Sequence, residues 1–489
     1  MSASRFIFLF AMPTLLLGLN SAFRALAFDD TLPNFNAPVD NTPLNVDKVN
    51  KYFGVTMFKD PSLWAEDDAS VASRLGWPAE SRTSTQSSYR LYPKENSPLS
   101  VLGAQAYSCV LYATNNRPTE ISIVFVNEGD YAFTRKILNR ATQLKPADEP
   151  TPEPSTNADD NPGTNNAPHT IKPSEDFEKL SRLRESDVSR ADREVHMAFE
   201  KALKQDAQTI TDALTKLFGD PAHMSFGGGS ETSERVLRWD WQGHAFLLAT
   251  PRDTYVTLRI VPVAFADNYG KGDVIDRDQL RADLLKRVQT SDSGDVVVGE
   301  IPMVDQGPKG YCVPATWERY MRYLGIPADM YVLAMAAGTT SDGGTNLEAM
   351  IQNVDSLVTL YHRRIDVIPG DLDMRVISKN IDKGLPLMWS CMIHVPLEKA
   401  VSKRKRERNN ITDWAAWATE LESRDKKEIP DEITNTDIVG GHQRMIIGYN
   451  IKTGEIAISD SWSQLFAIRW MTLREANAIN AGVCFVIEP

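Results

Sequence analysis

The pattern of apolar and polar positions predicts two sets of β-strands in the first part of the chain. Runs rich in β-branched and apolar residues at 106–113 and 120–126 predict the first set. Residues 174–218 are dense in Glu, Lys, Arg, Ala and Leu, and they predict a long amphipathic helix. The strands predicted after this helix are 234–241, 244–250 and 255–263. Helices followed by antiparallel strands are typical of an α+β domain.

The two strand sets resemble each other in sequence. Residues 51–54 read Lys-Tyr-Phe-Gly, and residues 216–219 read Lys-Leu-Phe-Gly. Each tetrapeptide follows a predicted helix and precedes predicted antiparallel strands. We therefore predict an internal duplication, with a first repeat at 28–145 and a second at 174–292, the two building one pseudo-symmetric α+β domain. The segment between them, 146–173, carries seven prolines and many polar residues, which predicts a disordered linker.

A different pattern begins near residue 293 and continues to residue 489. A strand predicted at 295–303 leads into a loop, and the order predicted between Cys312 and His442 is helix, helix, strand, helix, strand. Residues 397–436 are highly charged and helical in pattern, and we interpret them as an insertion. The remaining predicted elements are strands 466–471 and 483–487, with a helix at 473–479 between them.

Cys312 stands at the start of a predicted helix in this region. Gln306 lies six positions before it, across a loop that contains Gly307, Pro308 and Gly310. A thiol at a helix N-terminus feels the positive end of the helix dipole, which favours the thiolate. Because the thiolate is the nucleophilic form, the pattern is suited to covalent catalysis.

A base for such a nucleophile is available further along the chain. His442 leads an apolar strand, a short turn with Gly454 follows, and the next strand ends at Asp460. Two strands joined by a short glycine-containing loop predict a hairpin. The hairpin brings His442 and Asp460 together, so that the carboxylate can hold the imidazole in one tautomer.

These residues in this order resemble the papain-like cysteine peptidases, and within them the peptidase family C39-like group. The resemblance covers about 295–489 and implies a helix packed on an antiparallel sheet. It also implies that Cys312 is the nucleophile, His442 the base, Asp460 the residue that orients the base, and Gln306 an oxyanion donor. The sequence around Cys312 lacks the papain signature, and Asp460 stands where papain has asparagine. These departures favour the C39-like branch and leave substrate preference open.

Charge and composition narrow the possible partners. The chain has 489 residues, 42% of them hydrophobic, and a net charge of −12. This argues against nucleic acid as a partner. The resemblance to cysteine peptidases implies a peptide or protein substrate. No His/Cys cluster has metal-ligand spacing, so we expect neither a metal nor another cofactor. The oligomeric state is left open.

The first residues have the pattern of a targeting segment. Arg5 precedes an apolar stretch of 14 residues at 6–19, and Ala-Leu-Ala at 25–27 is a small-residue cleavage site. We predict a cleaved signal peptide at 1–27, no stable membrane span after its removal, and export to the periplasm, the cell surface or the medium. Four cysteines in so long a chain do not form a disulfide framework, and we expect Cys391 and Cys484 to be buried strand residues.

The sequence predicts an exported cysteine peptidase and leaves alternatives open. His394 is a rival base, although no acidic orienting partner follows it at hairpin distance. The basic run 403–408 is interpreted as a solvated helix face, or else as a cleft rim or a site for an acidic partner. Trp462 either covers the contact between His442 and Asp460 or is a core residue. The rival functions are a catalytically inactive binding protein on a papain-like scaffold and a thiol acyltransferase.

Overall fold

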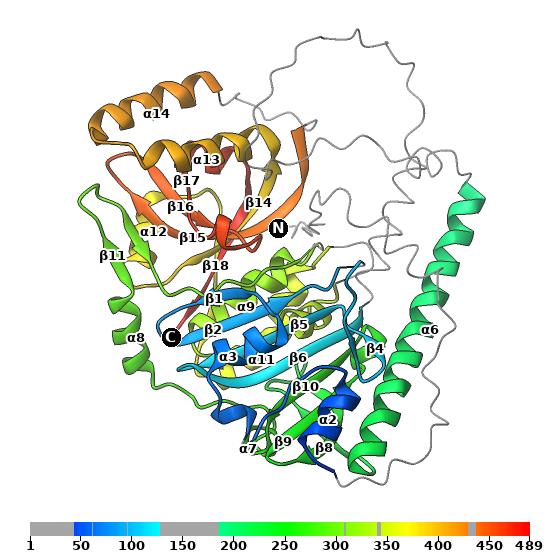
Figure 1. The fold of residues 1–489 in the computed structure, drawn as a ribbon. Coiled ribbons are helices and arrows are strands. Elements are labelled where there is room, and N and C mark those ends of the chain that lie inside the picture. The colour runs from blue at the N-terminus through cyan, green and yellow to red at the C-terminus, as the bar shows by residue number, and fades with distance from the viewer. Residues whose placement is uncertain are drawn as a thin grey trace, which may run out of the picture.

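The computed structural model describes residues 44–60, 62–94, 96–127, 185–307, 310–339, 344–428 and 437–489. Two eight-stranded sheets dominate it, one in the N-terminal half and one in the C-terminal half, and every strand pairing in them is antiparallel. Mixed helix and sheet content agrees with the predicted α+β class (Figure 1). The predicted signal peptide at 1–27 and linker at 146–173 lie outside the described residues.

The N-terminal sheet has the strand order β1-β2-β5-β6-β10-β9-β8-β7. The first four strands in this order come from the first predicted repeat and the last four from the second. Their last strands, β6 and β10, pair with each other at the centre. The bounds are β1 Ala79–Arg82, β2 Gln86–Leu91, β5 Ser108–Thr114, β6 Arg117–Asn127, β7 Ala222–Phe226, β8 Glu234–Trp241, β9 His244–Ala249 and β10 Tyr255–Pro262, with a small pair β3 Ser100–Val101 and β4 Ala104–Gln105 beside them.

Helices cover one face of this sheet and share an apolar core with it. The longest, α6 (Glu185–Phe218), runs along one side of the sheet (Figure 1). Both α6 and α2 (Val46–Phe53) end at a phenylalanine, and the glycine that follows each has a left-handed φ, 73° at Gly54 and 86° at Gly219. Glycine suits this position because a side chain would be strained there. The remaining elements are α3 Asp68–Leu75, η1 Leu63–Ala65, η2 Pro251–Asp253 and α7 Val263–Asp267.

The C-terminal sheet has the order β11-β12-β15-β14-β18-β13, and β16 and β17 branch from β15. The branch arises because β15 is long enough to pair with β14 along most of its length and with β16 at its end. The bounds are β11 Val288–Thr290, β12 Val296–Val298, β13 Arg364–Pro369, β14 Leu387–His394, β15 Ile438–Asn450, β16 Glu455–Ser459, β17 Arg469–Thr472 and β18 Asn480–Glu488. Cys391 and Cys484 are buried on β14 and β18, as predicted.

The helices of the C-terminal half differ in one place from the predicted order. A short helix, α10, follows the cysteine helix and precedes the predicted second helix, so the sequence pattern missed one element. The predicted strand at 295–303 is also shorter, because only β12 pairs in the sheet. The bounds are α8 Arg277–Lys286, α9 Cys312–Tyr323, α10 Met330–Ala336, α11 Leu347–Leu360, α12 Met374–Ile381, α13 Val395–Arg408, α14 Trp414–Glu428, η4 Gln464–Phe466 and α15 Leu473–Ala478.

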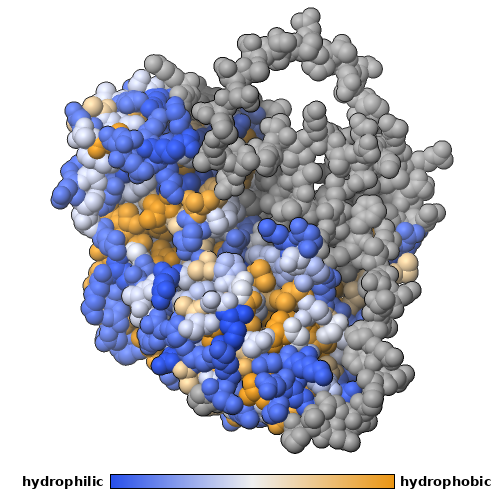
Figure 2. Space-filling model, viewed as in Figure 1, coloured by the Kyte–Doolittle hydropathy of each residue, from blue (hydrophilic) through white to orange (hydrophobic). Residues whose placement is uncertain are grey.

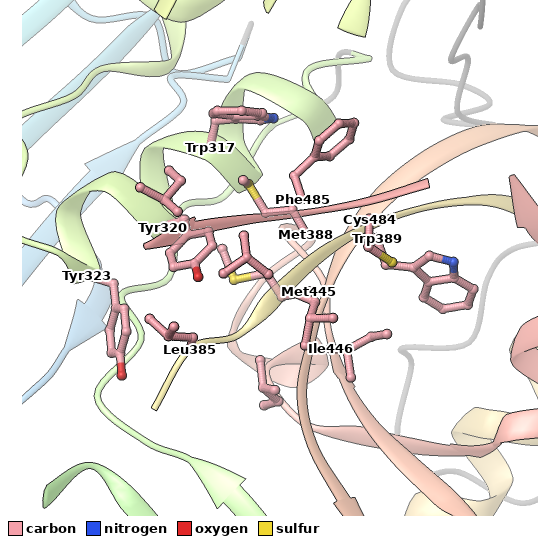
Figure 3. Close-up of a cluster of buried hydrophobic side chains, with 14 of the residues drawn as sticks. Trp317, Tyr320, Tyr323, Leu385, Met388, Trp389, Met445, Ile446, Cys484 and Phe485 are labelled. Atoms are coloured by element: carbon pink, nitrogen blue, oxygen red, sulfur yellow. The ribbon is translucent and has the colours of Figure 1, made fainter. Parts of the chain in front are cut away.

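Helix α9 is buried on both sides. Toward the C-terminal sheet, Trp317 and Tyr320 pack with the strand residues Phe485, Met388 and Met445 (Figure 3). The ring centroids of Trp317 and Phe485 are 6.0 Å apart. Among its twelve residues only Arg322 is not fully buried.

The opposite side of α9 carries charge and meets the N-terminal sheet. Glu318 accepts a hydrogen bond of 2.7 Å from the hydroxyl of Tyr112, and it lies 3.9 Å from the guanidinium of Arg90. Arg322 lies over the Tyr112 ring at 3.5 Å from its centroid. A buried carboxylate is tolerated only with such partners, so the N-terminal sheet supplies what the helix requires.

The loop that precedes α9 is also held by the N-terminal sheet. The N–H of Met303 donates to Ser81 Oγ at 2.9 Å, and the N–H of Asp305 donates to Glu80 Oε1 at 2.7 Å. The hydroxyl of Tyr92 donates to the carbonyl of Asp305 at 2.7 Å. Gly307 packs against the same ring, since an added Cβ there would meet Tyr92 at 2.8 Å.

The charged insertion forms α13 and α14, which cover one end of the molecule (Figure 1). Its basic run is not simply a solvated face. Arg404 and Arg408 are buried, and they form ion pairs with Glu475 and Glu455 respectively. The predicted solvated face is therefore wrong for these two residues, because they join the insertion to the sheet.

The surface of the molecule reflects this arrangement. Figure 2 shows mainly hydrophilic residues over α13 and α14, and apolar residues gathered in the recess between the C-terminal strands and the N-terminal sheet. No helix in the described parts of the chain combines the length and apolar character needed to cross a membrane.

Candidate active site

Cys312 is the first residue of α9, and its thiol is buried, with 1% of the residue exposed. Its hydrogen-bonding surroundings are backbone N–H groups, those of Gln443, Val313 and Cys312 itself. Thr316, one turn further along α9, donates its hydroxyl to the carbonyl of Gln443 at 3.1 Å. The start of α9 is thus attached to β15 at the residue that follows His442.

Burial decides the ionisation of this thiol. The loss of solvent raises the pKa of Cys312 to about 11, and the backbone N–H groups at the helix start offset this only in part. The sequence pattern predicted a helix terminus that favours the thiolate. The N–H groups do act in that direction, but in this arrangement desolvation is the larger effect.

His442 and Asp460 form a direct pair. His442 Nε2 lies 2.9 Å from Asp460 Oδ1, and both side chains are completely buried. The β15–β16 hairpin produces this contact, because His442 is in one strand and Asp460 directly follows the other. The other ring nitrogen, Nδ1, makes no hydrogen bond within the described part of the chain. It is therefore the nitrogen that can exchange a proton with a nucleophile.

Trp462 shields this pair. Its ring is stacked on the imidazole of His442, with centroids 4.6 Å apart and planes inclined by 28°. Phe466 in turn meets the edge of Trp462 at 5.4 Å. Aromatic cover of this kind excludes water from the hydrogen bond between His442 and Asp460.

Gln306 is attached to the residue that follows Asp460. The backbone N–H of Gln306 donates to the carbonyl of Ser461 at 2.9 Å, and the hydroxyl of Ser461 donates to Gln306 Oε1 at 2.8 Å. This second bond holds the side-chain amide of Gln306 beside Ser461. The loop before α9 and the end of β16 are thereby joined.

Two arginines, which the sequence analysis did not single out, bind Asp460. Arg444 Nε lies 3.0 Å from Asp460 Oδ1, and Arg469 Nη2 lies 2.6 Å from Oδ2. Glu398 of α13 bridges the same two arginines, at 2.7 Å from Arg444 and 2.8 Å from Arg469. The four charges close a ring with no net charge.

The ring sets the ionisation of its neighbours. Burial alone would raise the pKa of Asp460, but Arg444 and Arg469 hold it well below its usual range. Burial lowers the pKa of His442, and the hydrogen bond with Asp460 offsets this only in part. In this closed arrangement, therefore, Asp460 is ionised while the imidazole and the Cys312 thiol are neutral.

His394 lies apart from these groups. It ends β14 and is 6% exposed, whereas Cys391, three residues earlier in the same strand, is the Cα partner of His442. Three strand residues span about 10 Å. An acidic neighbour exists, since Asp437 Oδ2 lies 3.8 Å from His394 Nε2, but Asp437 immediately precedes β15 and does not follow His394 at hairpin distance.

The structure thus gathers Gln306, His442 and Asp460 through direct or shared contacts, and it places the Cys312 thiol against the residue that follows His442. The sequence pattern missed Arg444, Arg469 and Glu398. Only Arg444 carried a signal, because a residue two positions after His442 lies on the same face of the strand. Among the described residues, no group of three His, Cys, Asp or Glu side chains could hold a metal ion.

The C-terminal part of the chain is similar to a known family. The Peptidase_C39 like family matches residues 298–481. Xylellain, a cysteine protease from Xylella fastidiosa, is similar to 42% of this chain over 88% of its own length, with 11% identity and a TM-score of 0.27, a likeness too weak to carry an argument. No curated protein matches the chain in sequence. Residues 298–481 are therefore similar to the Peptidase_C39 like family.

Proposed function

We propose that the C-terminal domain hydrolyses peptide bonds, with Cys312 as nucleophile, His442 as base and Asp460 as the residue that orients it. The observation that carries the proposal is the buried pair of His442 and Asp460, 2.9 Å apart, on a hairpin whose β15 strand is attached to the start of α9. Asp460 accepts from Nε2 and so leaves Nδ1 for proton exchange with the thiol.

The reaction follows from these residue types. His442 Nδ1 takes the proton of the Cys312 thiol, and the sulfur attacks the carbonyl carbon of the scissile bond. The oxyanion is stabilised by the side-chain amide of Gln306 and the backbone N–H of Cys312. The imidazolium then protonates the leaving amine, which leaves a thioester on Cys312. Water attacks the thioester, His442 accepts its proton, and the acid product leaves with the thiol restored.

Burial favours the neutral forms of the Cys312 thiol and the His442 imidazole. The thiolate–imidazolium pair therefore forms when substrate or solvent reaches the sulfur. Burial of Cys312 is also the observation that favours a second candidate, an inactive binding protein that has kept the papain-like scaffold. Transfer of the acyl group to an amine instead of water is a third candidate. Adding an amine acceptor and analysing the products separates transfer from hydrolysis.

The test is labelling with a thiol-directed epoxide probe, together with the hydrolysis of a mixture of fluorogenic peptides. We expect the unmodified protein to be labelled and active, and Cys312→Ala to lose both properties. Cys391→Ala is the matched control, because this thiol is also buried and its pKa is also raised by burial, to about 12. Equal labelling of the two variants contradicts the proposal and supports the inactive binding protein.

Two further proposals concern the rest of the chain. We infer export from the pattern of residues 1–27, to be tested by the N-terminal sequence of the mature protein. We also infer that the N-terminal sheet arose by duplication. What supports this is the strand order, in which two sets of four strands meet at β6 and β10, and the Phe-Gly ends of α2 and α6.

A further inference from the structure

The ring of four charged side chains contains more groups than are required to orient His442. Its members are Asp460, Arg444, Glu398 and Arg469. One carboxylate suffices to hold an imidazole, yet here two arginines bind that carboxylate and a second carboxylate binds both arginines. All four residues are at most 15% exposed in their side chains. Charges so removed from water interact strongly with each other and with their neighbours.

Glu398 has a special position in this ring. It is the only member that comes from the charged insertion, where it lies in the first turn of α13. It binds both arginines, and its negative charge also acts on His442 through space. If its charge were absent, the guanidinium groups of Arg444 and Arg469 would face a single carboxylate. Their uncompensated positive charge would then raise the electrostatic potential at the imidazole and the thiol.

We propose that Glu398 is a positioning residue whose negative charge sets the pH range in which the Cys312–His442 pair is reactive. The inference rests on the proposed function. Its cause is electrostatic: Glu398 neutralises the positive charge that Arg444 and Arg469 direct at the pair. Without it, the imidazolium is harder to form and the thiolate easier to form, so both protonation steps move to lower pH.

Other charged and titratable groups from several elements lie around the pair. From α9 they are Cys312 and Arg319, whose guanidinium donates to Ser459 Oγ at 2.6 Å and to the carbonyl of Pro302 at 2.9 Å. From β14 it is Cys391, which stands opposite His442. Arg444 comes from β15 and Arg469 from β17. The carboxylates beside these groups are Asp460, which follows β16, and Glu398 of α13, so the loss of either changes the local balance by a full charge.

The effect of each charge on the reacting groups has a definite sign. The positive charge of Arg444 lowers the pKa of His442 and also that of Cys312, whereas the negative charge of Glu398 raises the pKa of His442. Removing Glu398 and removing Arg444 should therefore shift the pH dependence in opposite directions. Removing both should return it toward the starting position.

The experiment measures the rate of alkylation of Cys312 by iodoacetamide between pH 4 and pH 10, with the modified peptide identified by mass spectrometry. This readout requires no knowledge of the substrate. For Glu398→Gln we expect the midpoint to move down by roughly half a pH unit or more. For Arg444→Gln we expect it to move up, and for the double variant we expect an intermediate value.

Glu407→Gln is the matched control. Glu407 lies on the same helix and pairs with Arg424 and Lys403 instead of the ring, so its midpoint should equal that of the unmodified protein. If Glu398 had only a structural role, its replacement would change the alkylation rate at every pH and leave the midpoint of the pH dependence unchanged. An unchanged midpoint in Glu398→Gln overturns the inference, and this comparison decides the matter even if Arg444→Gln does not fold.

A fifth variant separates this inference from the proposed function. If the proposed function is right, His442→Ala loses the fast alkylation of Cys312 near neutral pH. If His442→Ala reacts like the unmodified protein, the catalytic pair does not exist and the proposed function fails. The shift in Glu398→Gln is measured independently of that result, because the field of the ring acts on the thiol itself.

Discussion

The contacts of Asp460 show which parts of the site depend on nearby sequence and which depend on distant elements. Its pairing with His442 could be predicted, because a hairpin with a short turn fixes which residues of its two strands stand side by side. Arg469 and Glu398 could not be predicted, because they come from β17 and α13. No local sequence pattern indicates where those two elements pack relative to Asp460. The ionisation of Cys312 was likewise out of reach, since it depends on burial by segments distant in sequence.

Replacing Asp460 tests the local part of this interpretation. In Asp460→Asn the amide still fills the space but no longer stabilises the imidazolium, and its NH₂ group faces two arginines. We expect kcat to fall by roughly 10²- to 10⁴-fold. Hydrolysis of a fluorogenic peptide measures this.

Asp437→Asn is the control for that variant, because Asp437 is the acidic neighbour of the rival base His394, 3.8 Å from its Nε2. It should retain nearly full activity. A larger loss of activity in Asp437→Asn than in Asp460→Asn would identify His394 as the base.

At the scale of elements, the sequence predicted the strands well where apolar residues alternate with turns. It missed α10, because this helix is buried all round and its seven residues show no polar face. It also missed the function of the basic run in α13, where positions that look alike in sequence differ completely in burial. Arg404 is 2% exposed, whereas Arg406, two residues later, is exposed.

This difference gives a prediction for the stability of the insertion. Arg404→Ala leaves Glu475 buried without its ion-pair partner, which costs roughly 3–5 kcal/mol in the free energy of unfolding. Arg406→Ala, in the same run, should change it by less than about 0.5 kcal/mol. Urea unfolding of the two variants measures both values, and similar losses would contradict the assignment of Arg404 as the anchor of α13.

The loop before α9 gives a prediction for pH. Burial raises the pKa of Asp305 to about 6, above the value near 4 of an unfolded chain. The folded state therefore prefers the protonated carboxyl, and the stability this contributes at low pH is lost as pH rises through about 6. Asp305→Asn keeps the oxygen that accepts from the N–H of Gly307 and removes the buried charge. It should stabilise the protein by about 1–2 kcal/mol at pH 7.5 and by little at pH 4.

Thermal unfolding of Asp305→Asn at several pH values between 4 and 8 measures this effect. A variant that is less stable than the unmodified protein at pH 7.5 would show that the ionised carboxylate is needed to hold the loop.

At the scale of the whole molecule, α9 joins the two sheets. One of its sides belongs to the apolar core of the C-terminal sheet, and the other meets Tyr112 and Arg90 of the N-terminal sheet. The resemblance to papain-like peptidases, which implies a helix packed on an antiparallel sheet, predicted only the first of these contacts. The second depends on buried charges, which a sequence pattern assigns to the surface.

The shared helix predicts that the two halves are coupled in stability. Tyr112→Phe removes the hydroxyl that donates to buried Glu318, which costs about 1–3 kcal/mol. We expect faster amide hydrogen exchange in both sheets of this variant, as measured by mass spectrometry. Tyr52→Phe, on α2 and distant from α9, is the control and should leave the C-terminal sheet unchanged. Faster exchange confined to the N-terminal sheet in Tyr112→Phe would show that the halves unfold independently.

The central pairing of β6 with β10 has a consequence for proteolytic maturation. Cutting the chain anywhere between Asn127 and Glu185 would separate the two sets of four strands covalently, yet they would remain hydrogen-bonded side by side in one sheet. A nicked molecule would therefore migrate as two fragments under denaturing conditions and as one particle under native conditions. Maturation by excision at this place would leave the partner of α9 in position.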